Sequence, residues 1–201
     1  MVARRYLPNA VRLGTCYTLS PMHAICSCKL PANALLNRYA GSGGYADCYV
    51  AEIARTVSHT EFVEAFYTTA VFKLERLILS LLVSRPSTDL QARQLAQGEI
   101  NTFAAWSVED RVPDQVLLCD YQGRTRSWLM IAASEDNDSP HTRLFFGSAI
   151  VPARSAAGRG RLGVVFKLLL GFHKLYSRVL LRAARLRLSR EILNKVICRI
   201  S

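Results

Sequence analysis

The chain has 201 residues, of which half are hydrophobic and a fifth are charged, and its 26 Lys and Arg outnumber its 15 Asp and Glu. This composition excludes a disordered chain, because such chains are too poor in apolar residues to bury a core. The net charge of +11 is unevenly placed: residues 47–153 are mildly acidic, whereas residues 154–201 hold twelve Lys and Arg against one acidic residue. The length suits one domain with basic ends.

Residues 1–43 are predicted to form a poorly ordered N-terminal extension. They contain Pro8, Pro21 and Pro31 and show no sustained hydrophobic periodicity. Their Arg-containing, acid-free composition is typical of a mitochondrial targeting segment, while a start codon placed too early, with Met22 as the next candidate, explains it equally well. No apolar run in the chain reaches the length of a membrane-spanning helix.

A strand and a capped helix are predicted next. Apolar and polar residues alternate imperfectly over residues 46–54, which favours a strand. Ser58 and Glu61 have the spacing of a capping box, in which each side chain bonds the backbone N–H of the other residue. A helix therefore begins here, and the β-branched and aromatic residues 67–69 predict a break before a second helix.

The second helix is predicted to bury its leucines and to end at Pro86. The apolar residues that share its expected core face are Phe72, Leu74, Leu77, Ile78, Leu81 and Leu82. Lys73, Glu75 and Arg76 lie on another side of the same helix. A short third helix, capped by residues 87–89, is predicted to end at about Ala96.

From Glu99 the pattern changes to strands. Four strand-like segments are separated by turn residues, at 100–108, 115–121, 125–133 and 142–151. Gln122-Gly123 marks a hairpin turn, because glycine supplies the positive φ that such turns need. Strands joined by short loops must be antiparallel, since a parallel return requires a long crossover.

A long amphipathic helix is predicted from Leu162 to about Leu188, followed by a basic tail over residues 189–201. Its basic residues fall three or four apart and form one stripe: Lys167, Lys174, Arg178, Arg182 and Arg185. Its apolar side includes Leu175, Tyr176, Val179 and Leu180. The stripe fits a solvated face, an anionic membrane surface or the phosphates of nucleic acid. Interleaved aromatic residues and a nucleic-acid-binding motif are both missing, which argues against sequence-specific recognition.

This order of elements, together with several short motifs, resembles a known superfamily. The motifs are residues 106–111, Ser127-Trp128, residues 146–149 and residues 172–178. They resemble an uncharacterised bacterial family, domain of unknown function 2867, within the START-like and polyketide-cyclase-like helix-grip superfamily. The resemblance covers about residues 45–188 and implies an α+β helix-grip fold, with a curved antiparallel sheet wrapped around a long C-terminal helix. We therefore expect a START-like domain over residues 44–188.

The resemblance also implies a pocket between the sheet and the long helix that binds a small apolar or amphipathic ligand. Five residues are candidates for its lining: Trp106, Arg111, Trp128, His173 and Tyr176. The two Trp residues suit a pocket wall or ordinary core packing. His173 and Tyr176, one helical turn apart, suit polarisation of a ligand carbonyl or satisfied positions at the edge of a core. Arg111 suits bidentate binding of a carboxylate or phosphate, or else a surface cluster with Glu109 and Asp110.

Three functional hypotheses follow. The first is a carrier or sensor of a small apolar ligand. The second is a cyclase or hydratase that uses His173, Tyr176 or the Glu109–Arg111 cluster in an enclosed pocket, with no residue assigned as catalytic. The third is a module that contacts an anionic membrane through its basic helix. The Cys and His residues lack metal-ligand spacing and no phosphate-binding or dinucleotide motif is present, so neither a metal nor a cofactor is predicted. We expect a cytoplasmic protein, or one peripheral at the inner surface of a membrane.

Overall fold

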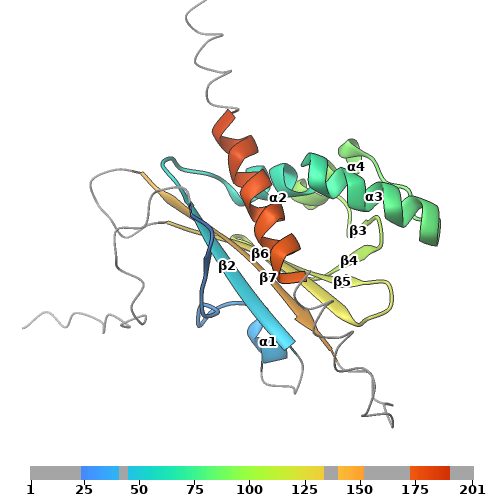
Figure 1. Ribbon diagram of the computed structural model, residues 1–201, viewed down its shortest axis with the longest axis horizontal. Coiled ribbons are helices and arrows are strands. Elements are labelled where there is room, and N and C mark those ends of the chain that lie inside the picture. The colour runs from blue at the N-terminus through green and yellow to red at the C-terminus, as the bar shows by residue number, and fades with distance from the viewer. Residues whose placement is uncertain (1–23, 41–44, 134–139, 152–172, 191–201) are drawn as a thin grey trace, which may run out of the picture.

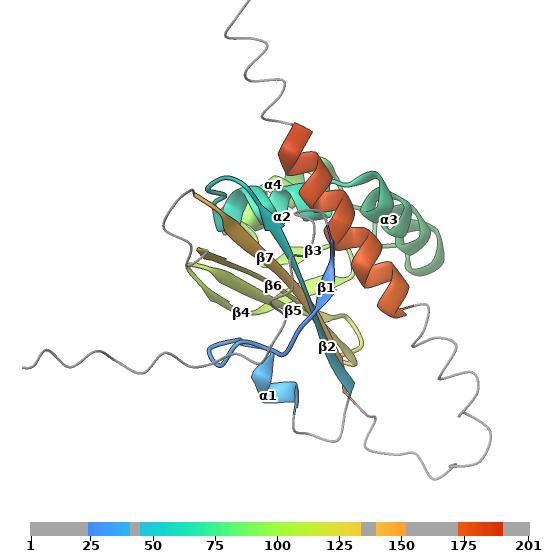
Figure 2. The same cartoon turned by 60° about the vertical axis from the view of Figure 1, so that its left-hand side comes forward.

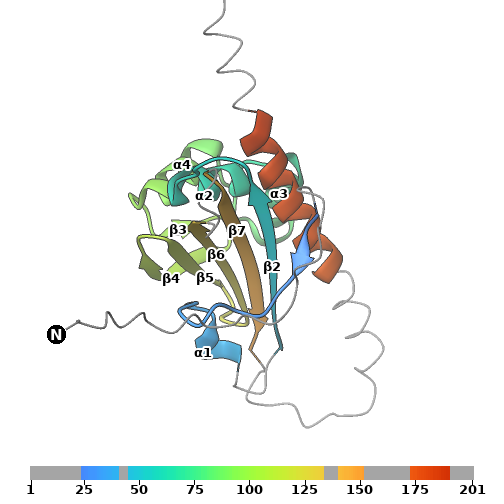
Figure 3. The ribbon, with the colours of Figure 1, turned by 90° about the vertical axis from the view of Figure 1, so that its left-hand side faces the viewer.

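The computed structural model describes residues 24–40, 45–133, 140–151 and 173–190. These residues form an α+β fold in which a curved antiparallel sheet carries helices on one face and the N-terminal segment (residues 24–40) on the other (Figure 1, Figure 3). No helix in these ranges is long and apolar enough to cross a membrane.

The described sheet has seven strands in the order β1-β2-β7-β6-β5-β4-β3, and each strand is antiparallel to its neighbours. The strands are β1 (Cys26–Ser27), β2 (Tyr45–Ile53), β3 (Thr102–Phe103), β4 (Trp106–Val112), β5 (Gln115–Asp120), β6 (Thr125–Ala133) and β7 (Thr142–Ile150). The strand predicted over residues 46–54 is confirmed as β2, and it pairs with β7 along its whole length.

Helices α2 (His59–Tyr67), α3 (Ala70–Val83) and α4 (Asp89–Gln97) follow β2, and the short α1 (Asn37–Ala40) precedes it. The predicted capping box at Ser58 is confirmed, with Glu61 N 3.2 Å from Ser58 Oγ and Ser58 N 2.8 Å from Glu61 Oε2. The break between α2 and α3 also falls at the predicted residues.

Residues 173–190 form the C-terminal helix, which lies across the sheet beside α3 (Figure 1, Figure 2). The first part predicted for this helix, residues 162–172, and most of the predicted basic tail, residues 191–201, lie outside the described residues.

Alternating side chains of the central strands divide the interior into two cores. On the inner face, β2, β5, β6 and β7 contribute residues that pack against the helices, including Tyr49, Val116, Leu129 and Phe146. On the outer face, the intervening residues pack against the N-terminal segment, including Cys48, Leu117, Trp128 and Phe145. Because side chains of a strand alternate between faces, neighbouring residues of one strand serve different cores.

The N-terminal segment is folded onto the sheet, which differs from the expectation that residues 1–43 form a poorly ordered extension. The side chain of Leu36 is completely buried in the outer core. Gln115 Oε1 accepts the backbone N–H of Leu35 at 3.0 Å, and Gln115 Nε2 donates to the carbonyl of Asn33 at 3.1 Å. Residues 24–40 therefore close the outer face of the sheet.

Helix α3 is rotated relative to the prediction. Leu74, Leu77, Ile78 and Leu81 are exposed, with Leu81 at 75% of its full accessible area. Arg76, which was predicted to lie on another side of the helix from the apolar residues, is buried and donates hydrogen bonds to Ser87 and Asp89. The prediction was wrong because apolar residues surround most of this helix, so its periodicity does not single out the core side.

The strand predicted over residues 100–108 is replaced by β3 and a longer β4. Strand β4 continues to Val112, and its register shifts between Val108 and Asp110. A bulge of this kind inserts an extra residue and bends the strand. Arg111 is the next-to-last residue of this strand.

Gly147 in β7 packs closely against the N-terminal segment and against both neighbouring strands. A Cβ atom at this position would lie 2.8 Å from the carbonyl oxygen of Asp47, 2.9 Å from Leu36 Cδ2 and 2.9 Å from Trp128 Cε3. These separations are too short for a carbon atom, so only glycine fits while Leu36 and Trp128 hold their positions.

Replacing Leu36 with Ala tests whether the N-terminal segment belongs to the fold. Removal of a fully buried Leu side chain typically lowers the free energy of unfolding by about 2–5 kcal/mol, because a cavity is left behind. Urea unfolding of Leu36→Ala should show a loss in this range. Leu90→Ala is the matched control, since Leu90 is 62% exposed. Equal stability of the two variants would show that residues 24–40 do not cover the sheet.

Candidate functional site

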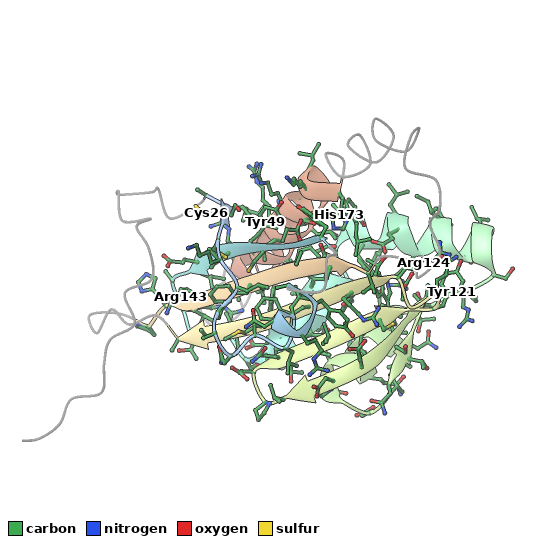
Figure 4. All side chains as sticks on the ribbon, turned by 90° about the horizontal axis from the view of Figure 1, so that it is seen from below. Cys26, Tyr49, Tyr121, Arg124, Arg143 and His173 are labelled. Atoms are coloured by element: carbon green, nitrogen blue, oxygen red, sulfur yellow. The ribbon has the colours of Figure 1, made fainter. Side chains whose placement is uncertain are left out.

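A cavity of about 230 Å³ lies between the inner face of the sheet, α3 and the C-terminal helix. Its apolar walls include Phe66 of α2, Phe72 of α3, Phe146 of β7 and Leu180 of the C-terminal helix. For comparison, a dry cavity of about 150 Å³ is large enough to bind benzene. In Figure 4, Tyr121 and Arg124 mark the β5–β6 turn, and His173 marks the first described residue of the C-terminal helix. Tyr121 and His173 both line the cavity.

Glu75 and Tyr176 form a hydrogen-bonded pair in this cavity. The Tyr176 hydroxyl donates to Glu75 Oε2 across the contact between α3 and the C-terminal helix. Burial raises the pKa of the Glu75 carboxyl above its usual value, and the hydrogen bond from Tyr176 opposes this rise. Burial and the neighbouring Glu75 charge both raise the pKa of Tyr176, so its hydroxyl keeps its proton and acts as the donor.

A second polar chain links β2, β7 and the C-terminal helix. Ser148 Oγ lies 2.6 Å from Asp47 Oδ1 and 2.6 Å from His173 Nε2. The Ser148 hydroxyl donates its one proton to Asp47 Oδ1, so in this geometry Ser148 Oγ accepts a hydrogen bond from the Nε2–H tautomer of His173. In this arrangement His173 does not take the Ser148 proton, which distinguishes the chain from a Ser–His–Asp triad, where the Asp binds the His.

Two buried donors at the cavity have no hydrogen-bond partner among the described residues. Ser177 is fully buried, and its Oγ atom completes no hydrogen bond. The indole Nε1 of Trp106 is also buried without a hydrogen bond of normal geometry, although its N–H lies near enough to Glu75 to lower the pKa of that carboxyl. Buried polar groups are nearly always hydrogen-bonded, so these two atoms can serve a bound molecule.

The structure brings three of the five predicted ligand-binding residues together. Trp106, His173 and Tyr176 all line the cavity. Trp128 does not, because it points to the outer face of the sheet, where its Nε1 donates to Gln115 Oε1 at 2.9 Å. Arg111 does not line the cavity either, since its guanidinium donates to the carbonyl of Leu95 at 2.8 Å, in the last turn of α4.

The neighbouring carboxylates of β4 also lie apart from the cavity lining. Asp110 pairs with Arg38 of the N-terminal segment, and Glu109 pairs with Arg126. Among the described residues, no group of three His, Cys, Asp or Glu side chains is placed to hold a metal ion.

Sequence reasoning missed Glu75, Ser148 and Ser177. Glu75 lies three residues after Phe72, so the two share one face of α3. Because leucines surround most of α3, the sequence pattern did not indicate that the face shared by Phe72 and Glu75 points inward. Ser148 follows Phe146 by two residues in β7, which places it on the same inner face of the sheet. That spacing was the available signal for Ser148.

The basic stripe is only partly on the surface. Lys174, Arg178 and Arg182 are exposed, whereas Arg185 is buried, and Lys167 lies outside the described residues. The predicted apolar side is also rotated. Leu175 and Val179 are exposed, while Leu180, Leu181, Ala184 and Leu188 pack into the inner core.

No protein-family model, no curated protein and no solved structure matches the chain. The resemblance to a family therefore stays a prediction, and the site is interpreted from its own residues.

Substitution of Glu75 by Gln should stabilise the protein at pH 8 and change its stability little at pH 4. The raised pKa means that folding disfavours the ionised carboxyl. The wild-type protein therefore has its full stability below the ordinary Glu pKa and loses stability as the pH rises through the pKa of the folded state. Gln is neutral at both pH values and still accepts a hydrogen bond from Tyr176.

Urea unfolding at the two pH values measures this difference. Glu99→Gln is the matched control, because Glu99 is exposed and its substitution should change the free energy of unfolding by less than about 0.5 kcal/mol. A Glu75→Gln protein that is less stable than wild type at both pH values would contradict the expected effect of burial.

Proposed function

We propose that the protein binds a small amphipathic molecule in the cavity, within a fold of the helix-grip type. The fold assignment is supported by the order of elements, in which a strand and helices precede an antiparallel meander and a final helix. The pairing of β2 with β7 and the packing of the C-terminal helix onto the inner face also support this assignment.

The observation that carries the proposal is the combination of apolar walls with buried donors that lack a partner. Ligand sites are typically concave and mostly apolar, with a few polar groups that orient the ligand. In this cavity, Phe66, Phe72 and Phe146 supply apolar area, while Ser177 and Trp106 supply the donors. The volume suits a molecule with one or two rings.

Binding is better supported than the alternative of a cyclase or hydratase. The Ser148 proton is directed to Asp47, and His173 is a donor to Ser148, so the histidine does not activate this hydroxyl as a nucleophile. An enzyme of this kind would instead need the Glu75–Tyr176 pair as its acid and base, because these two groups are hydrogen-bonded to each other in the cavity.

The two tryptophans provide a test of binding in the wild-type sequence. Trp106 lines the cavity and Trp128 lies on the opposite face of the sheet. In protein labelled with 5-fluorotryptophan, titration with 2-phenylethanol, 2-phenylethylamine or phenylacetate should shift the ¹⁹F resonance of Trp106 saturably and leave that of Trp128 unchanged. Trp106→Phe assigns the two resonances. The proposal fails when none of the three probes shifts the Trp106 signal selectively.

We propose, as a second candidate, that the outer face of the C-terminal helix contacts an anionic membrane surface. Exposed apolar and basic side chains share this face at helical spacing: Leu175, Arg178, Val179, Arg182 and Leu186. Such a face suits an interfacial helix, whose apolar residues enter the headgroup region while its basic residues pair with lipid phosphates. Leucines of α3 are also exposed, so the protein presents apolar surface to solvent on this second helix as well.

Vesicle co-sedimentation tests the membrane contact. The protein should pellet with vesicles of phosphatidylcholine and phosphatidylserine at 3:1, and much less with phosphatidylcholine alone. Basic residues near an anionic surface contribute about 1 kcal/mol each, so Arg178→Glu with Arg182→Glu should weaken binding more than about tenfold. The control reverses two exposed charges elsewhere, Arg93→Glu with Arg124→Glu. Equal pelleting of the two double variants would refute a specific contact through this helix.

A further inference from the structure

We propose that the cavity selects ligands that carry a protonated amine, with the Glu75 carboxylate as the partner of that amine. This inference rests on the proposed binding function and names the chemical class of the ligand. It is carried by the geometry of Glu75, by the charges around the cavity and by the aromatic rings that line it.

Glu75 lacks a cationic partner among the described residues. Most of its side chain is buried in the cavity wall, and the hydroxyl of Tyr176 is its hydrogen-bond donor. None of the ion pairs formed by the described residues includes Glu75. Buried carboxylates are normally paired with a cation, because an isolated buried charge is strongly unfavourable. The position of that cation is therefore open to a ligand.

The other charges of the lining also favour a cation. Asp120 lines the cavity, and its Oδ1 accepts the neutral backbone N–H groups of Arg124 and Thr125, at 2.7 and 2.9 Å. Among the described residues, no ion pair includes Asp120. Arg126 and His173 are the basic side chains of the lining. Arg126 is engaged by Glu109 while its guanidinium lies 4.6 Å from the ring of Tyr39, and His173 is hydrogen-bonded to Ser148. An anionic ligand would thus meet two carboxylates and an arginine that is already paired.

Aromatic rings complete a site for an amine. Phe66, Phe72, Trp106 and Tyr176 line the same cavity as Glu75. The face of an aromatic ring attracts a cation, and this attraction is largest when the cation is removed from water. A ligand with an ammonium group on a small apolar body would therefore place its charge at Glu75 and its body against the rings.

A matched ligand series separates charge from shape. The probes 2-phenylethylamine, 2-phenylethanol and phenylacetate share one ring and differ in the end group. At pH 7.5 the amine is protonated, because alkylammonium groups have a pKa near 10. The ¹⁹F resonance of Trp106 reports the dissociation constant of each probe. We expect the amine to bind wild-type protein at least about tenfold more tightly than the alcohol, and phenylacetate to bind most weakly.

Glu75→Gln tests the role of the carboxylate directly. This variant should lose about tenfold in affinity for the amine and keep its affinity for the alcohol within about twofold. Glu99→Gln, at an exposed position, should leave both affinities unchanged. Thermal unfolding verifies that each variant is folded, and the comparison of amine with alcohol in wild-type protein needs no variant at all.

The outcomes separate this inference from the proposed function. Equal affinities of wild-type protein for amine and alcohol, both measured at Trp106, would overturn the selection of amines and leave the binding function intact. An equal loss of affinity for the amine and the alcohol in a folded Glu75→Gln protein would also overturn the selection of amines, because Glu75 would then shape the cavity without pairing a charge. Failure of all three probes to shift the Trp106 resonance would overturn the binding function and this inference together.

Discussion

The register between β2 and β7 determines which residues meet in the interior. Nine residue pairs, from Tyr45 with Ile150 to Ile53 with Thr142, join the first long strand of the sheet to the last. This pairing sets Asp47 opposite Ser148, whose hydroxyl then reaches both Asp47 and His173. A shift of one residue would reverse the faces of every side chain in the strand. The cavity, the outer core and the surface on which the C-terminal helix packs all depend on this one alignment.

The sequence predicts those parts of the fold that local chemistry controls. Ser58 and Glu61 locate the start of α2 because a capping box is a short-range interaction, and Gly123 marks a turn because it adopts a positive φ of 71°. The face of α3 was predicted wrongly because leucines surround the helix. The folded state of residues 24–40 was not predicted, because it depends on tertiary contacts such as those of Gln115 with Asn33 and Leu35. Local hydrophobic periodicity does not indicate such contacts.

The candidate site was predictable to the extent that it lies on regular elements with clear faces. Trp106, His173 and Tyr176 were predicted because an aromatic residue on a strand that faces the final helix, and polar residues on that helix, suit the wall of a pocket. Trp128 was misassigned because a strand presents alternate residues to opposite faces, and the identity of the covered outer face was unknown. Glu75 illustrates a different limit: a carboxylate among leucines is usually a solvated residue, and only the packing of α3 against Tyr176 turns it inward.

Gly147 has a consequence for comparisons between chains. Its missing side chain leaves just enough space for the carbonyl of Asp47, for Leu36 of the N-terminal segment and for the indole of Trp128. Any side chain at this position would force Leu36 or Trp128 to move. In a related protein, glycine at the equivalent position together with a large aromatic residue opposite it would therefore signal a covered outer face. A bulkier residue there would signal a sheet whose outer face is packed in another way, and this one position would serve as a marker of the difference.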